Sequence, residues 1–255
     1  MTALKNTDDH FTFFCIETDW LSRAQVVNTC AYISEEFGIA PEQITIFCKP
    51  NRSFVKSVSK SHLIRYFTRL FIIIKKILKF EFVESLYMRF QTYLAKRNTL
   101  SQNIFPTVRV EKANSDTFLN FLKLHKSVYV FFIHFDEIIK EEILSSCLPI
   151  NIHSGFLPEF RGCHPLHWQI LDNKTVSCLT IHKMTKGLDE GNIIVEVPFD
   201  LKTTKSSTWH MFYNYRHNVL KNSLIIAIRR ILFFDRDFGI NQDHYKGESN
   251  YYTRP

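Results

Sequence analysis

Short apolar runs alternate with stretches of helical periodicity along much of this chain, and this rhythm restricts the folds open to it. Residues 11–16 (FTFFCI) are almost wholly apolar, as in a strand that is covered on both faces. We predict further strands at 44–48, 107–111, 128–133 and 149–153, and helices at 23–37, ending at Gly38, and at 115–126, capped by Asn114 or Ser115. Strands separated by helices form parallel sheets. The sequence therefore predicts an α/β, Rossmann-like fold in which helices cover both faces of a mostly parallel sheet.

Glycine is scarce and phenylalanine abundant, with 7 Gly and 24 Phe among 255 residues. Neither glycine-rich phosphate loop, GxGxxG or GxxxxGK[ST], occurs in the chain. A bound nucleotide would therefore have to be held in another way. The length suits one large domain, and we predict a single domain over residues 1–255.

Basic charge is concentrated in one segment of the chain. The formal net charge is +7, yet residues 49–100 alone hold twelve Lys or Arg against two Glu. Such a patch attracts phosphates, anionic lipid or nucleic acid, although a solvated helix face is its commonest explanation. The basicity therefore belongs to this segment and is not a property of the whole fold.

The same segment has the spacing of amphipathic helices. Leu63, Phe67, Leu70, Phe71 and Ile74 follow i, i+3, i+4 spacing, and basic residues occupy much of the opposite face. We predict a helical insertion at about 52–100 within the sheet domain. Its apolar face would pack on the sheet of its own subunit, form a homodimer interface, or lie on an anionic membrane surface.

The cysteines and the apolar runs indicate the cellular compartment. The six cysteines lack a CxxC pair, and free, mostly buried thiols in a reducing cytoplasm are the default interpretation. The first ten residues are polar, unlike a signal peptide, and basic residues interrupt the best candidate for a membrane span. We expect a cytoplasmic protein without a transmembrane segment.

The candidate site begins with Asn151-Ile152-His153 at the end of a predicted strand. Because side chains alternate along a strand, Asn151 and His153 share one face near the carboxyl edge of the sheet, where open α/β folds bind ligands. Asp189 lies in a loop between two apolar runs, where a carboxylate could orient a histidine or raise its pKa. An amide donor, an imidazole and a carboxylate suit acyl transfer to an amine.

Four segments in this region also resemble a known family. The chain reads NIHSGFLPEFRG, HPLHW, TIHKM and GLDEG in order, within about 50 residues. This order resembles that of the formyltetrahydrofolate-dependent formyltransferases, which act on methionyl-tRNA, glycinamide ribonucleotide or sugar nucleotides. The resemblance is sharp only over about 128–197, and we recognise no counterpart of residues 49–106 in the family. The family usually has a glycine-containing turn after its first strand, where this chain has ETDW.

The resemblance implies a role for particular residues. Asn151, His153 and Asp189 match the family's catalytic trio, and His134, Phe135, Ile138 and Ile139 fall in the segment that holds the pterin ring of 10-formyltetrahydrofolate. Arg161 and Trp168 are weaker candidates for substrate binding. No metal is expected, because the spacing of His153, His164, His167 and His182 lacks a zinc-ligand pattern. His164-Pro165 is better interpreted as the start of a helix than as part of a metal site.

The resemblance also bears on the acceptor. Fewer than 60 residues follow Val197. We expect them to form a mainly helical extension at about 203–255, with helix over 207–232. A methionyl-tRNA enzyme would instead continue into a tRNA-binding domain. The end, YYTRP, resembles that of several sugar-modifying members. The expected partners are therefore a nucleotide-linked amino sugar for surface polysaccharide (O-antigen type) and folate, and nucleic acid is not expected. The alternatives are another amine, methionyl-tRNA or glycinamide ribonucleotide, and an inactive homologue that binds a membrane surface through its basic insertion.

Overall fold

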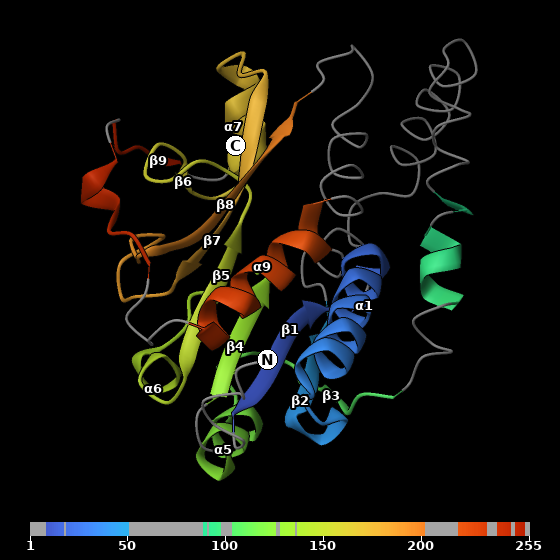
Figure 1. The fold of residues 1–255 in the computed structure, drawn as a ribbon. Coiled ribbons are helices and arrows are strands. Elements are labelled where there is room, and N and C mark those ends of the chain that lie inside the picture. Colours follow the sequence, from blue (N-terminus) through green and yellow to red (C-terminus); the bar gives the residue numbers. More distant parts are fainter. Residues whose placement is uncertain are drawn as a thin grey trace, which may run out of the picture.

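The computed structural model describes residues 9–17, 19–50, 89–90, 92–97, 104–125, 128–135, 137–201, 219–233, 239–245 and 248–252. Its centre is a seven-stranded sheet in the order β3-β2-β1-β4-β5-β7-β8 (Figure 1). The strands are β1 (His10–Ile16), β2 (Ile44–Lys49), β3 (Thr107–Arg109), β4 (Val128–Ile133), β5 (Leu148–His153), β7 (Val176–Lys183) and β8 (Ile193–Asp200).

The five strands predicted from the sequence form the parallel part of this sheet. β3, β2, β1, β4 and β5 pair in parallel, and β7 and β8 then add an antiparallel hairpin beside β5. The third strand is shorter than predicted, ending at Arg109, although the Val110 amide still donates to the carbonyl of Cys48. The predicted α/β, mostly parallel fold is confirmed.

Helices cover both faces of the sheet, as predicted. α1 (Trp20–Phe37) and α9 (Leu220–Phe233) lie across one face (Figure 1). α5 (Asp116–Leu124) and α6 (Glu141–Leu144) contribute buried residues to the core on the other face. The two cores divide by strand alternation: Phe13 packs under α1 and α9, while its neighbour Phe14 packs with α5.

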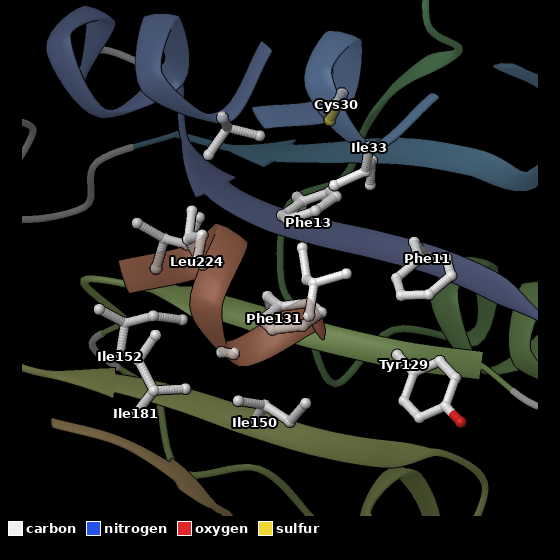
Figure 2. Packing of buried hydrophobic residues seen from close by; sticks show 14 of the residues in the cluster. Phe11, Phe13, Cys30, Ile33, Tyr129, Phe131, Ile150, Ile152, Ile181 and Leu224 are labelled. Carbon is white, nitrogen blue, oxygen red and sulfur yellow. The ribbon is translucent and has the colours of Figure 1, made fainter. Parts of the chain in front are cut away.

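Phenylalanine fills both cores. Phe13 of β1 stacks on Phe131 of β4 at 5.2 Å between ring centroids, in the cluster that Figure 2 shows. On the opposite face Phe14 stacks on Phe47 at 5.7 Å and on Phe132 at 5.8 Å. Each of these five rings is at most 1% exposed, and burying one contributes about 1.5–3 kcal/mol. Nine of the 24 Phe are buried in the part of the chain that the structure describes, so the core accounts for a substantial share of them.

Helix ends follow the local sequence. α1 begins at Trp20, three residues before the predicted start, because the Asp19 carboxylate accepts a hydrogen bond from the Ser22 amide. It ends at Phe37 as predicted, where Gly38 adopts a φ of 67°. Ser115 caps α5, which ends at Leu124 instead of 126.

Most of the predicted insertion, 52–100, lies outside the described residues, and only 89–90 and 92–97 are described there, as helix. Of the predicted extension at 203–255, the structure describes α9, η4 (Gln242–His244) and β9 (Tyr251–Tyr252), and 202–218 also falls outside. Within the described ranges no helix is both long and apolar enough to traverse a bilayer. All six cysteines are free thiols and four are buried, as predicted.

Candidate active site

The amide and imidazole of the Asn-Ile-His run lie on one face of β5, as predicted. Ile150 and Ile152 point into the core beneath α1 and α9, so Asn151 and His153 face the other side. His153 is the last residue of the strand and is 5% exposed, whereas Asn151 is half-buried. Both side chains therefore lie towards the carboxyl edge of the parallel strands, where ligands of open α/β sheets bind.

Asp189 reaches these two residues from the loop between β7 and β8. Its Oδ1 accepts a hydrogen bond from Asn151 Nδ2 at 3.2 Å, and its Oδ2 accepts one from the Gly162 amide at 2.8 Å. The same Oδ2 lies 3.6 Å from His153 Nδ1. The structure thus brings together the three residues that the sequence singled out, although Asp189 is 36 residues beyond His153.

Hydrogen bonding determines which nitrogen of His153 carries the proton. His153 Nε2 lies 2.6 Å from the carbonyl oxygen of Phe160, which can only accept, so Nε2 is the protonated nitrogen. The lone pair of the neutral ring is then on Nδ1, the nitrogen that faces Asp189. Nδ1 is therefore the atom through which His153 can take up a proton.

Burial and charge keep the histidine and the aspartate in different protonation states. Burial lowers the pKa of His153, although the Asp189 carboxylate opposes this. Burial alone would raise the pKa of Asp189, but His153, His182 and the Gly162 amide together hold that pKa well below the usual range. At neutral pH the site therefore contains an uncharged base beside an ionised carboxylate.

His182 completes the cluster, and the sequence analysis missed this role. It lies directly across from Asn151 in the β5–β7 register and is 1% exposed. Its Nδ1 donates to the carbonyl of Lys183 at 2.9 Å, so its Nε2 accepts a hydrogen bond from Asn151 Nδ2 at 3.2 Å. The TIHKM motif was the available signal, because its histidine precedes the loop that carries Asp189. The described residues contain no group of three or more His, Cys, Asp or Glu side chains placed to hold a metal ion.

The segment predicted to hold the pterin follows β4, the strand next to β5. His134 adopts a φ of 52°, and its Nδ1 lies 3.1 Å from Ser22 Oγ and 3.3 Å from Asp19 Oδ2. Phe135 packs edge-on against Phe14 at 5.1 Å. These two predicted residues therefore secure the start of the loop against α1 and the core.

The rest of that loop presents one apolar side chain to solvent. Ile138 is 85% exposed and Ile139 is 5% exposed. Asn114 holds the backbone on both sides of Ile139: its side chain donates to the Ile138 carbonyl at 2.8 Å and accepts from the Lys140 amide at 2.9 Å. This loop therefore combines a hydrogen-bonded backbone with an exposed isoleucine.

A family model described as formyl transferase matches residues 91–224, more than half of the chain. The chain belongs to this family. The expectation that residues 49–106 lack a counterpart in the family is therefore wrong for residues 91–106. A curated relative, the methionyl-tRNA formyltransferase of Borrelia duttonii, is 30% identical over 152 residues, which make up 58% of this chain and 47% of that protein. The chain spans less than half the length of this relative and of three other curated relatives that it matches.

Solved structures share the fold of this formyl transferase family member. The N-formyltransferase from Helicobacter canadensis, solved with folinic acid and dTDP-3-aminofucose, has a TM-score of 0.52 at 19% identity, covering 95% of this chain and 70% of that one. Phosphoribosylglycinamide formyltransferase from Streptococcus pneumoniae has a TM-score of 0.52 at 15% identity, covering 87% of this chain and 97% of that one. At these identities the likeness establishes the fold.

Arg161, predicted to bind substrate, has hydrogen-bond partners within this formyl transferase chain. Its Nε and Nη2 donate to Gln242 Oε1 at 3.2 and 2.7 Å. Its Nη1 donates to Ser249 Oγ at 2.9 Å and to the Tyr251 hydroxyl at 2.8 Å. Arg161 therefore ties the strand β6 (Arg161–Gly162) to the C-terminal segment, which contains Gln242, Ser249 and Tyr251.

Trp168, the second predicted substrate residue, packs on the same C-terminal segment. It lies in α7 (Pro165–Leu171), which begins at Pro165 as predicted. Tyr252 of β9 lies between Trp168, at 5.1 Å, and Phe160, at 5.5 Å, with both ring pairs stacked. At Gly162 the φ of 94° and the close carbonyl of Tyr252 leave no room for a side chain. β9 therefore pairs tightly with β6 at Gly162, the residue whose amide donates to Asp189.

Proposed function

We propose that the protein transfers the formyl group of 10-formyltetrahydrofolate to a primary amine. The proposal rests mainly on the contact between the uncharged Nδ1 of His153 and the ionised Asp189, beside the amide of Asn151. A buried base of this kind can remove a proton from an attacking amine at neutral pH, which typically supplies about 10²–10⁴ in rate.

Each residue of the trio has one part in the reaction. As the amine nitrogen bonds to the formyl carbon, His153 Nδ1 accepts the proton that this nitrogen loses. The imidazolium that forms is stabilised by Asp189 and by the Phe160 carbonyl. Asn151 donates to the formyl oxygen as negative charge develops on it, exchanging its hydrogen bond to His182 for this contact. When the bond from carbon to the folate nitrogen breaks, that nitrogen receives the proton from His153 directly or through water held by Asp189.

The formyl donor would lie on the loop after β4. Ile138 and Ile139 would contact the pterin, and His134 and Phe135 would keep the loop in place. The folate supplies an activated formyl group attached to nitrogen. The protein would contribute the orientation of that group towards Asn151.

The acceptor we propose is the amine of an amino-deoxy sugar nucleotide, which yields an N-formylated sugar for surface polysaccharide of the O-antigen type. The Tyr251-Tyr252 end resembles that of sugar-modifying members. The Tyr251 hydroxyl donates to the carboxylate of Glu190, the residue after Asp189, and Tyr252 stacks on Trp168. The Helicobacter canadensis neighbour was solved with dTDP-3-aminofucose. Trp168 and Arg161 would then border the sugar nucleotide, Trp168 with its ring and Arg161 with its charge.

A second acceptor is supported by a different observation. The curated relatives above 28% identity include several methionyl-tRNA formyltransferases. Methionyl-tRNA is therefore the alternative acceptor, with the same trio acting on the amino group of its methionine.

A direct test incubates the protein with 10-formyltetrahydrofolate and a panel of acceptors: amino-deoxy sugars linked to dTDP, GDP or UDP, charged methionyl-tRNA, and glycinamide ribonucleotide. Mass spectrometry then detects the gain of one CO unit on the acceptor. We expect the gain on a sugar nucleotide and its loss in His153→Asn. Transfer only to tRNA would refute the sugar proposal, and release of tetrahydrofolate with no acceptor in the panel formylated would refute the choice of acceptors as a whole.

A further inference from the structure

Gln242, which carries no role in the mechanism above, is one of the most completely hydrogen-bonded side chains near the site. It lies in η4 and is 3% exposed. Its Nε2 donates to the carbonyls of Asp189 and Gly191 at 2.8 and 2.9 Å. Its Oε1 accepts both hydrogen bonds from Arg161. Both donor hydrogens and both acceptor positions of the amide are thus in use.

The backbone that Gln242 binds is in a conformation that needs support. Asp189 has a φ of 54°, a left-handed conformation that costs a non-glycine residue about 1 kcal/mol or more. Two positions later, a side chain on Gly191 would collide with the Lys183 carbonyl, so the loop is closely packed on β7. The two hydrogen bonds from Gln242 span this turn and come from a segment 53 residues beyond Asp189.

Arg161 makes the same amide part of a larger connection. It immediately precedes Gly162, whose N–H donates to the Asp189 carboxylate. Gln242 therefore joins, through a single side chain, the backbone of Asp189 and the strand that binds the carboxylate of Asp189. A displacement of this side chain would move both supports of the catalytic carboxylate together.

We propose that Gln242 is a positioning residue for formyl transfer, holding the Asp189 carboxylate at its distance from His153 Nδ1. The inference rests on the proposed function for its kinetic test. It adds a residue of the C-terminal segment to the determinants of the reaction rate, acting through Asp189 and without touching the substrate.

Two substitutions separate this role from simple anchoring of the C-terminal segment. Gln242→Glu keeps, and with its charge strengthens, the acceptor for Arg161, but it places a carboxylate oxygen against the carbonyls of Asp189 and Gly191. Gln242→Met keeps a side chain of similar length but removes all four hydrogen bonds. If Gln242 positions Asp189, both variants should lower kcat by about 10–100-fold with little change in KM, since a misplacement of about 1 Å can cost 10² in rate. If Gln242 only anchors the segment through Arg161, Gln242→Glu should retain wild-type kcat, and that result would overturn the proposal.

The chain offers a matched control in Gln43. This residue lies in the 3₁₀ turn η1 (Pro41–Gln43), and its Nε2 donates to the carbonyl of Asp9 at 3.1 Å, at the start of β2 and far from the carboxyl edge. Gln43→Glu repeats the same chemical change with a comparable loss of a backbone contact. We expect it to lower the free energy of unfolding without lowering kcat.

A measurement on the protein without substrate distinguishes failure of this inference from failure of the proposed function. NMR of ¹⁵N-labelled histidine follows the titration of His153 in wild type and in Gln242→Met. Because the Asp189 carboxylate raises the pKa of His153, its displacement should move that titration to lower pH. An unchanged titration of His153 would refute the positioning role whatever the acceptor is, and it also decides the matter if Gln242→Glu fails to fold.

Discussion

Replacing Asp189 by Asn removes the negative charge of the site while preserving the size of the side chain. The carboxylate accepts two hydrogen bonds with different oxygens, one from Asn151 Nδ2 and one from the Gly162 amide. An asparagine side chain offers one acceptor oxygen, so its NH₂ group must face one of these two donors. His153 also loses the opposite charge that lies 3.6 Å from its Nδ1.

These losses translate into separate effects on stability and on rate. One hydrogen bond to a charged acceptor contributes about 1.5–3 kcal/mol, and we expect Asp189→Asn to lower the free energy of unfolding by about that amount. The imidazolium formed during transfer is no longer stabilised, so kcat should fall by about 10²–10⁴, the range for a positioned acid or base. The pKa of His153, already lowered by burial, should fall further because Asp189 raises it.

The pH profile gives the most direct test of this coupling. In wild type, kcat/KM should rise with pH as His153 loses its proton, and in Asp189→Asn the same limb should appear at lower pH and with a lower plateau. Formyl transfer to the best acceptor from the panel would be followed across the pH range, with unfolding by urea measured in parallel. Asp200→Asn, at the exposed end of β8, is the control and should change neither quantity. A rising limb at the wild-type pH in Asp189→Asn would refute the proposed contact between Asp189 and His153.

Three further changes test other parts of the structure. Burial, together with His125, lowers the pKa of His10 to about 4. The free energy of unfolding should therefore decrease by about 2 kcal/mol as the pH falls from about 6.5 to about 4, after allowance for solvent screening. Urea unfolding of His10→Leu should lack this part of the pH dependence, and a pH dependence identical to that of wild type would contradict the assignment. The Lys49 side chain is 0% exposed, and its Nζ lies 2.8 Å from the Glu137 carboxylate. Glu137→Gln should therefore lower the free energy of unfolding in urea by about 3–5 kcal/mol, and the double variant with Lys49→Met should regain part of that loss. A loss within error of zero would refute the importance of this ion pair. Tyr252→Ala removes the ring that stacks on Phe160 and Trp168. Limited proteolysis should then cleave the C-terminal segment faster than in wild type. An unchanged cleavage rate would show that stacking does not hold the segment in place.

The parallel sheet could be predicted because each of its strands is a short apolar run. FTFFCI and VYVFFI are buried on both faces, and such runs carry a signal that does not depend on distant residues. The start of α1 was predicted three residues late, because the cap depends on a side-chain contact of Asp19 that the 3.6-residue period does not reveal. Element type was therefore readable from pattern, whereas the helix start depended on one hydrogen bond.

The proximity of Asn151, His153 and Asp189 could also be predicted, because the order of their motifs resembles that of a known family. Asn151 and His153 share one strand face by alternation alone, and Asp189 lies in a loop bounded by two glycines. His182 was missed because its role depends on the register of β7 against β5, which places it opposite Asn151. A slip of that register by one residue would turn the histidine to the other face of the sheet.

Gln242 lies beyond the reach of any such pattern, and this has a consequence for the reaction. The residues proposed to touch the reacting atoms occur between Asn151 and Asp189, whereas the side chain that binds the backbone of Asp189 comes from η4. Its partner Arg161 follows directly after Phe160, whose carbonyl sets the tautomer of His153. If Gln242 positions Asp189, a displacement of the C-terminal segment would reach both the base and the carboxylate through this one amide. Sequence changes in that segment should alter the rate of transfer without altering the identity of the groups that carry it out.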